Sequence, residues 1–309
     1  MAALPPRALA LSTLTLVVAL TTAGCAGLGG GGDAVVVTET VATVTGVPVQ
    51  GGVDGPAAPA DPRPVPPAAP PAATQSPPEA ADLAAVVSVA PGPAGVALAP
   101  VGGPDQVAAA GTWQSGVAWS TIKVPLAVAV ARSSPQNLEN AASAITVSDN
   151  QAAESLWSAL GGGDAAASAV GAVLAEGGDT VSQVPSVRTR DGYSIFGQTR
   201  WSLVDQTRFA SNLPCLTGAG RVVDLMGQIA PVQQWGLGRI SGARFKGGWG
   251  PGETGGYLVR QFGLVPGAGG DVAVALAVEA PTFEAGTAAL SSMAEALAPS
   301  LASLPGGGC

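Results

Sequence analysis

The stretch over residues 26–81 contains little that could build a hydrophobic core, and this confines a compact fold to the chain that follows it. Residues 26–81 are rich in Gly, Ala and Pro. A segment of this composition cannot offset the entropy lost on ordering, and its prolines favour extended conformations. We therefore expect a linker over residues 26–81, one domain with a sizeable core over residues 82–305, and a flexible tail at residues 306–309.

The segment before the linker has the features of an export signal. Arg7 is followed by a nearly uncharged apolar run through Leu20, which is too short for a stable transmembrane helix. The ending, Thr22 to Cys25, resembles a bacterial lipobox. The resemblance implies a signal peptide over residues 1–25 and an acylated Cys25 that anchors the protein at the extracytoplasmic face of the cell membrane. Cleavage by ordinary signal peptidase and release of a soluble protein is the alternative.

Net charge and cysteine content limit the partners and the redox chemistry. The formal charge of −8 argues against nucleic acid as a partner. Besides Cys25 the chain has two cysteines, Cys215 and Cys309. Export would permit a disulfide between them, and two unpaired thiols are the alternative.

The chain has no histidine, which excludes Ser-His-Asp and Cys-His mechanisms and most protein zinc sites. We expect neither a metal nor a cofactor. Nucleophilic catalysis would need Lys, Glu, Asp or Tyr as its base. Lys123 and Lys246 are the two lysines among thirteen basic residues. Because lysine, unlike arginine, can give up its proton, these are the positions where amine chemistry could matter, unless codon usage alone left them.

Ser120 and Lys123 stand at the start of an apolar run that is typical of a buried helix. Ser120 and Thr121 would be capping residues, and Pro125 would lie within the first turn. Positions three apart share a helix face, so the amine could reach the hydroxyl. Burial would lower the pKa of the amine and make it a usable base. The alternative is a capping serine beside a snorkelling lysine.

Two further short motifs could complete a site. Ser148, Asp149 and Asn150 precede a second helical stretch, where such residues are preferred caps. A functional interpretation makes Ser148 a proton shuttle and lets Asn150 bind a substrate amide and hold Lys123. Lys246 begins a Lys-Gly-Gly sequence on an expected edge strand. Its glycines would let a peptide-like substrate add to the sheet, and a hairpin with one exposed lysine is the alternative.

Together, Ser120-x-x-Lys123, Ser148-Asp149-Asn150 and Lys246-Gly247-Gly248 resemble the three motifs of the class A β-lactamases and penicillin-binding proteins. The resemblance spans about residues 84–300. It implies a monomeric serine hydrolase acting on a β-lactam or a D-alanyl peptide of the cell wall. Its roles would be distributed as follows: Ser120 nucleophile, Lys123 base, Ser148 and Lys246 proton relays, Asn150 and Gly248 substrate contacts, and the backbone N–H groups of Ser120 and Trp249 the oxyanion hole.

The sequence departs from the family at three points. The interval from Ser120 to Ser148 is 28 residues, about half of the family spacing, which implies a trimmed helical lobe. Lys-Gly-Gly lacks the hydroxyl that contacts a substrate carboxylate in the family. Arg260 is a candidate substitute, or else a surface charge.

The third departure is in residues 178–201, which match the family's Ω-shaped loop but contain no glutamate. Asp191 is the nearest acid, and we expect it to pair with Arg188 or Arg190. Without a positioned base, deacylation should slow by about 10²–10⁴-fold. The resemblance then favours a slow acyl-enzyme former, such as a penicillin-binding protein or D,D-peptidase. A binding or structural lipoprotein that kept the cleft and lost turnover is the alternative.

The expected fold is α+β: an antiparallel five-stranded sheet flanked by helices, plus a mostly helical lobe. The lobe would span residues 120–230, and a helix over residues 284–304 would pack across the sheet. Strands are expected at residues 94–100, 106–110, 243–249, 257–265 and 272–280. Five aromatic residues could line a substrate groove or lie in the core: Trp119, Tyr193, Phe196, Trp235 and Trp249.

Overall fold

A computed structural model describes residues 80–253, 255–304 and 306–309. The expected signal peptide, the lipidation site at Cys25 and nearly all of the expected linker lie outside these residues.

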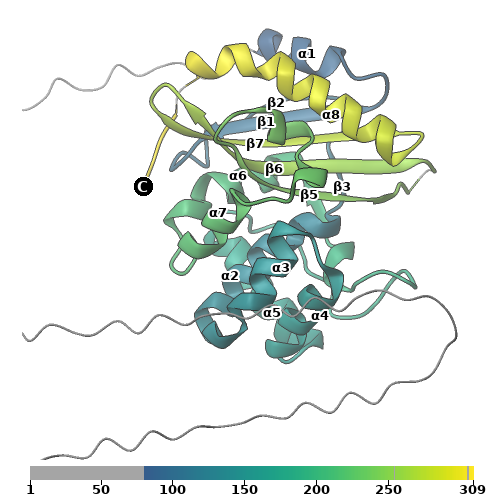
Figure 1. Cartoon of the computed structure of the whole chain (residues 1–309), viewed down its shortest axis with the longest axis vertical. Helices are drawn as coiled ribbons and strands as arrows, with labels where there is room; N and C mark the ends of the chain where they lie inside the picture. Colours follow the sequence, from purple (N-terminus) through teal and green to yellow (C-terminus); the bar gives the residue numbers. More distant parts are fainter. Residues whose placement is uncertain (1–79, 254, 305) are drawn as a thin grey trace, which may run out of the picture. The chain divides into compact units, whose positions relative to one another are not determined.

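A five-stranded antiparallel sheet forms the central layer, in the order β2-β1-β7-β6-β5 (Figure 1). This confirms the predicted fold class. The strands match the predicted ranges closely, because β1, β6 and β7 are buried runs rich in Val, Leu and Ala and glycine or proline lies at or near their ends. They are β1 (Ala94–Pro100), β2 (Ala108–Gly111), β5 (Arg244–Pro251), β6 (Tyr257–Gly267) and β7 (Gly270–Ala280).

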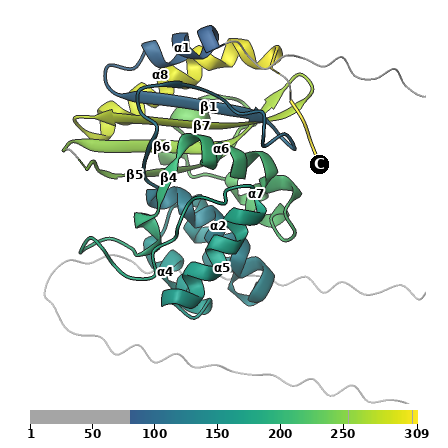
Figure 2. The same cartoon turned by 180° about the vertical axis from the view of Figure 1, so that it is seen from behind.

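Helices cover both faces of the sheet, which explains why its central strands, β1, β7 and β6, are buried along most of their length. Helices α1 (Ala80–Ser88) and α8 (Phe283–Leu297) lie on one face (Figures 1 and 2). Helix α6 (Leu203–Asn212) packs against β1, β6 and β7 on the other. Fully burying one Val or Leu side chain contributes about 1.5–3 kcal/mol. Helix α8 ends earlier than predicted, because Pro299 in the following turn cannot continue the backbone hydrogen bonds.

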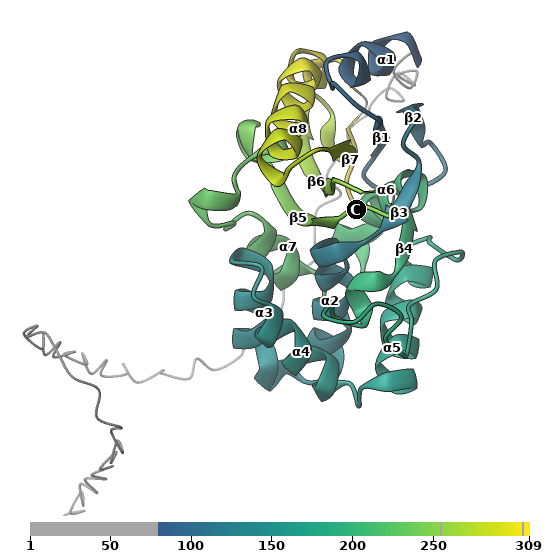
Figure 3. The same cartoon turned by 90° about the vertical axis from the view of Figure 1, so that its right-hand side faces the viewer.

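The helical lobe lies on the side of α6 that faces away from the five-stranded sheet (Figure 3). The prediction placed all of residues 120–230 in the lobe, and this is wrong for α6, whose Phe209 packs on Phe262 of the sheet. A two-stranded sheet that was not predicted, β3 (Ser115–Val117) with β4 (Arg200–Ser202), lies at the base of the lobe. The lobe helices are α2 (Lys123–Ser133), α3 (Leu138–Thr146), α4 (Asn150–Ala159), α5 (Gly163–Glu176) and α7 (Gly220–Met226).

No single helix in the described ranges is both long and apolar enough to cross a membrane. The pair α4 and α5, bent by 98°, satisfies the length and composition only when the two are taken together.

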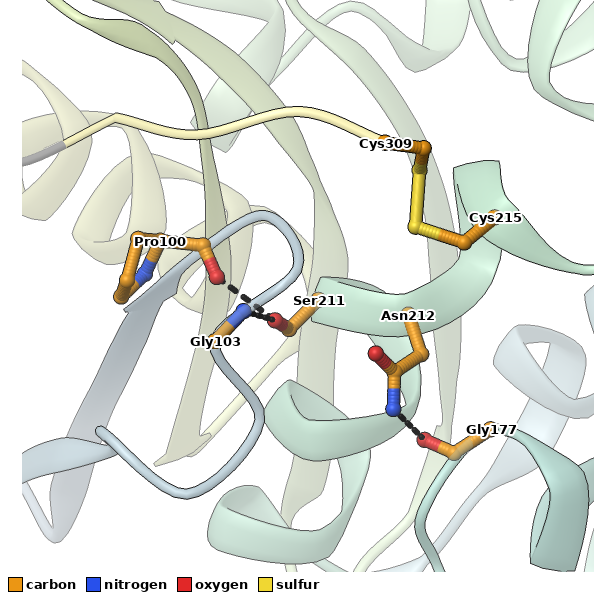
Figure 4. Close-up of a disulfide and its surroundings, with 7 residues drawn as sticks. All are labelled: Pro100, Gly103, Gly177, Ser211, Asn212, Cys215 and Cys309. Carbon is orange, nitrogen blue, oxygen red and sulfur yellow. Dashed lines mark hydrogen bonds between the residues drawn. A yellow bond between two sulfur atoms is a disulfide. The ribbon is translucent and has the colours of Figure 1, made fainter.

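The C-terminal tail is tied to the domain at two points. Cys309 forms a disulfide with Cys215, with a Cα–Cα distance of 5.4 Å (Figure 4). Gly307 exchanges two backbone hydrogen bonds with Asp271 of β7, at 2.9 and 2.8 Å. The expectation of a flexible tail over residues 306–309 is therefore wrong. Closing a loop of 94 residues stabilises the fold by about 4–5 kcal/mol in the chain-entropy account.

Candidate active site

Ser120 lies in a 3-10 turn, η1 (Trp119–Ile122), directly before α2. The prediction that Ser120 and Thr121 cap this helix is wrong. Thr121 Oγ1 instead donates to the carbonyl of Ala118 at 2.6 Å, and the tight turn supplies the first backbone bonds of the helix. Ser120 is half-buried and its side chain makes no capping bond. Ser120, the candidate nucleophile, thus lies at the start of α2, and its hydroxyl takes no part in capping that helix.

Backbone strain occurs at Ser148 and at the residue directly before Ser120. Within the described ranges, the non-glycine residues with positive φ are Trp119, at 51°, and Ser148, at 59°. One precedes Ser120 and the other is itself a motif residue. Such conformations cost about 1–3 kcal/mol each and persist where the surrounding structure enforces them, most often at functional sites.

Lys123 is almost completely buried, at 1% exposed. Its Nζ donates to the carbonyl oxygens of Ser148 and Asp149, at 2.6 and 3.2 Å, and to Asn150 Oδ1 at 2.7 Å. Ser148 Oγ is a fourth and more distant acceptor, at 3.5 Å. The three shorter bonds match the three N–H groups of an ammonium. In the described part of the chain, none of the bonds of Nζ leads to Ser120. The role of Lys123 as the base for Ser120 stays a prediction.

Burial lowers the pKa of Lys123 from 10.5 to about 7, against the opposing charges of Asp149 and Glu154. Desolvation disfavours the ammonium, whereas nearby carboxylates favour it. Near neutral pH both forms of the amine are populated. A general base is most effective when its pKa lies near the operating pH.

Lys246 is fully buried on β5 and completes the cluster. Its Nζ donates to Ser148 Oγ at 2.8 Å and to the carbonyl of Gly247 at 2.9 Å. Burial, and then the nearby charge of Lys123, lowers the pKa of Lys246 well below 10.5. Two acceptors match a neutral amine with two N–H groups. Because Ser148 Oγ is also 3.5 Å from Lys123 Nζ, one hydroxyl lies between both lysines.

Of the two glycines of the third motif, Gly247 faces the ring of Trp235 and Gly248 lets the protein's own backbone approach closely. That they also let a substrate add to the edge of the sheet stays a prediction. A Cβ on Gly248 would lie 2.9 Å from the backbone nitrogen of Ser120 and 2.8 Å from the carbonyl of Ala118. Strand β5 therefore runs directly against the Ser120 turn. Trp249, the next residue, packs its ring on Trp235 and Phe283 on the opposite face of the sheet.

A cleft of about 390 Å³ opens in front of this cluster. Trp119 and Tyr193 line it, as predicted for the groove, whereas Phe196 and Trp235 lie in the core. Trp249 also borders the cleft, although its ring packs on Trp235 and Phe283. Its polar lining includes Ser120, Asn150, Glu154 and Arg188.

Sequence reasoning missed Glu154, which lies in the cleft one helical turn after Asn150 on α4. The spacing of four residues was the available signal, since it places both side chains on one face of the helix.

Arg260 does not reach the cleft, so its predicted role as a carboxylate contact is wrong. It is fully buried and donates to the carbonyls of Gly116 in β3 and Trp201 in β4, at 3.1 Å each, and to Gln206 Oε1 at 2.9 Å. Burial lowers the pKa of Arg260 to about 9, which still leaves it charged at neutral pH. It ties the small sheet and α6 to β6.

The predicted pairing of Asp191 with Arg188 or Arg190 is also absent from the ion pairs of the described residues. Arg190 instead lies over the rings of Trp119 and Tyr193. Nor do the described residues contain a cluster of three His, Cys, Asp or Glu that could hold a metal ion.

Comparison with known proteins finds no matching family model and no matching curated sequence. Solved structures do match. A variant of the last common ancestor of Gram-negative bacteria β-lactamase class A superimposes with a TM-score of 0.56 at 18% identity, covering 74% of this chain and 99% of that one. A β-lactamase from Sphaerobacter thermophilus gives 0.55 at 19%, covering 72% and 98%. One from Desulfarculus baarsii gives 0.52 at 18%, covering 71% and 96%. The chain therefore has the β-lactamase/transpeptidase-like fold of the class A β-lactamases.

Proposed function

We propose that this protein is an exported serine hydrolase that forms an acyl-enzyme through Ser120 with β-lactams or D-alanyl peptides of the cell wall. One observation carries the proposal. The Ser148 hydroxyl lies between the amines of Lys246, at 2.8 Å, and Lys123, at 3.5 Å, and both lysines are buried behind a cleft that Ser120 lines. A structural role alone gives no reason to bury two amines around one hydroxyl, because desolvation penalises each of them.

The hydrogen bonds of Lys123 suit a base that changes its protonation state. A neutral amine has two N–H groups and one lone pair. The two short bonds, to the Ser148 carbonyl and Asn150 Oδ1, would use both N–H groups. The longer bond to the Asp149 carbonyl, at 3.2 Å, would be given up. The lone pair is then free to take the proton of Ser120.

The proposed reaction balances its protons within the cluster. Ser120 Oγ attacks the substrate carbonyl as its proton passes to Lys123, and the backbone N–H groups of Ser120 and Trp249 stabilise the oxyanion. When the carbon–nitrogen bond breaks, the leaving nitrogen takes the proton of Ser148. Ser148 regains a proton from Lys123, which returns to its neutral form, while Lys246 holds the Ser148 oxygen in place.

Hydrolysis of the acyl-enzyme should be slow. The loop over residues 178–201 has no glutamate to activate water. Lack of a positioned base slows such a step by about 10²–10⁴-fold. Slow turnover fits a penicillin-binding protein or D,D-peptidase better than an efficient β-lactamase.

Covalent labelling tests the proposal. A fluorescent penicillin should label the wild-type protein and the control Ser155→Ala, which removes an exposed serine on α4. It should not label Ser120→Ala. Intact mass should rise by the mass of one penicillin, and the loss of that mass over hours gives the deacylation rate. No label on the folded wild type at high penicillin concentration would contradict the proposal.

A second candidate function is a cell-envelope binding or structural protein without turnover. All three N–H groups of an ammonium at Lys123 find acceptors in the 148–150 turn, and the third motif lacks its hydroxyl. Calorimetry separates the two functions. Equal, reversible binding of penicillin by wild type and Ser120→Ala, without label, would favour binding alone.

We also propose that residues 1–25 are a lipoprotein signal and that Cys25 is the acylated residue. The support is the sequence ending at Cys25 and the Gly-, Ala- and Pro-rich stretch that follows it. In a bacterial host, Cys25→Ala should move the protein from the membrane fraction to the medium or the periplasm, and metabolic labelling with palmitate should disappear.

A further inference from the structure

Two arginines beside the cleft have no carboxylate partner among the described residues. The five ion pairs in that part of the chain involve other arginines: Arg132, Arg200, Arg208, Arg239 and Arg244. Within the described ranges Arg188 and Arg190 form no ion pair, although acidic residues outnumber basic ones in the chain by 21 to 13. Asp191 is their immediate neighbour and still pairs with neither.

Arg190 is held by aromatic rings. Its guanidinium carbon lies 5.5 Å from the centre of the Trp119 ring and 5.0 Å from that of Tyr193, and the two rings meet edge to face at 5.0 Å. Cation–π contact fixes the plane of the guanidinium and leaves its N–H groups to seek acceptors. Within the described ranges, Nη1 of Arg190 is buried and has none. Buried donors without a partner are rare in folded proteins and call for a ligand or water.

The side chain of Gln198, which is 8% exposed, holds the backbone of the loop that carries these arginines. Its Oε1 accepts from the backbone N–H groups of Thr189 and Arg190, at 2.9 and 2.7 Å. Its Nε2 donates to the carbonyls of Arg190 and Ser194, at 3.1 Å each, and of Tyr193, at 3.3 Å. One buried amide therefore sets the backbone over residues 189–194 before any ligand arrives.

The aromatic platform is equally constrained. Trp119 holds a positive φ of 51°, and a Cβ on Gly250 would come within 2.5 Å of its indole ring. Strand β5 has glycine where the ring must fit. A strained tryptophan, a glycine that accommodates it and a loop anchored by one glutamine together form a preorganised surface.

We propose that Arg188 and Arg190, on the surface formed with Trp119 and Tyr193, bind a carboxylate on the acyl side of the substrate. The inference rests on the proposed function of Ser120. The cleft extends from Ser120 and Asn150 to Arg188, Tyr193 and Ser194, and Arg190 lies over two of its lining rings, Trp119 and Tyr193. A group attached to the acyl carbon would face this loop. A guanidinium edge donates two parallel N–H bonds to a carboxylate.

The acidic residue in the cleft does not neutralise this surface. Glu154 belongs to α4, on the side of Asn150, and its charge acts on Lys123. It forms no ion pair with Arg188 or Arg190 in the described chain. The negative charge of Glu154 thus balances the lysine cluster, while the positive charge of the loop remains available.

Two matched penicillins test the proposal: benzylpenicillin and its α-carboxy derivative, which differ by one carboxylate on the acyl side. The rate constant of acylation of the full chain, followed by intact mass, should be about tenfold higher for the α-carboxy compound. Arg190→Gln and Arg188→Gln should each reduce that ratio towards one. Arg221→Gln, which removes an exposed arginine on α7, should leave it unchanged.

A second measurement keeps the two proposals separate. If neither compound acylates the wild type, the proposed function fails, and calorimetry with both compounds on Ser120→Ala still examines the subsite. Tighter binding of the α-carboxy compound, lost in Ser120→Ala combined with Arg190→Gln, would support it. Equal rates or affinities for the two compounds, or a ratio unchanged by both arginine variants, would overturn it.

Discussion

The lysines and the arginines of this domain differ in what they can do with charge. The lysine cluster (Lys123 and Lys246 around the Ser148 hydroxyl) is buried, and burial lowers the pKa of both amines. The cations Arg188 and Arg190 at the rim, and the buried Arg260, are guanidinium groups, which hold their proton more firmly than an amine does. Arg260, with a pKa of about 9, stays charged at neutral pH. Charge at the base of the cleft is therefore adjustable, which suits proton transfer, whereas charge at the rim and in the sheet is permanent, which suits binding and structure.

Replacing Lys123 by a residue that keeps its charge should have the largest effect, and the effect should be on the rate of acylation. Lys123→Arg keeps a cation in the pocket but removes its ability to accept a proton. We expect acylation by penicillin to fall by about 10²–10⁴-fold. The reciprocal control is Arg132→Lys on the same helix, where an exposed arginine pairs with Glu176. Retention of full acylation by a folded Lys123→Arg protein would break the distinction between the two kinds of cation.

Removing a permanent charge from the sheet should cost stability rather than chemistry. Arg260→Met leaves the buried carbonyls of Gly116 and Trp201, and Gln206 Oε1, without their donor. We expect the free energy of unfolding in urea to fall by about 3 kcal/mol or more, at about 1–3 kcal/mol for each unsatisfied buried group.

Arg239→Met is the matched control, because its ion pair with Glu295 is exposed and is worth less than about 1 kcal/mol. If Arg260→Met instead kept its stability and weakened only the affinity for penicillin, Arg260 would be a substrate contact after all.

These contrasts also show what the sequence could reveal. Runs of apolar residues over 94–100 and 272–280 predict central strands, because helices on both faces leave no polar side. Two lysines in an arginine-biased chain, one three residues after Ser120 and the other directly before Gly247, predict the cluster. The side of the sheet to which Arg260 points could not be predicted. Because β6 is buried on both faces, its sequence shows no alternation of polar and apolar residues that would tell one face from the other.

The 3-10 turn at Ser120 and the ordered C-terminal tail were not predicted, for a different reason. Trp119 has a positive φ, and its ring packs against Gly250 and Tyr193, which come from remote parts of the chain. The glycine-rich tail has no side chains to bury, and it is ordered by the disulfide at Cys309 and by pairing with Asp271. Local propensity carries no information about either contact.

The lysine cluster should also make stability depend on pH in a predictable direction. The pKa of Lys123 is about 7 when folded and 10.5 when unfolded, so the unfolded chain binds more protons between these values. Stability therefore rises with pH in this window, by about 2 kcal/mol from pH 7 to pH 9. Urea unfolding at the two pH values measures the change, and Lys246 adds to it with the same sign.

Lys123→Met should flatten this dependence without abolishing it, since Lys246 remains. A wild-type stability that falls between pH 7 and pH 9 would mean that the amines are charged when folded, and the contrast with the arginines would be lost.

The smallest effect concerns Glu154, the carboxylate that acts on the adjustable charge. Its negative charge raises the pKa of Lys123 against the effect of burial. Glu154→Gln should therefore lower that pKa and move the rise of acylation with pH to lower pH. At pH 6 acylation should be about twofold faster, the size expected of one partly exposed charge, and at pH 9 it should be unchanged.

Glu139→Gln on α3, which removes an exposed carboxylate, should leave the pH profile of acylation where it is. A Glu154→Gln protein with slower acylation at every pH and an unmoved midpoint would contradict the electrostatic account. It would place the carboxylate in the reaction itself, because a group that only tunes the lysine changes where the profile rises and leaves the limiting rate at high pH intact.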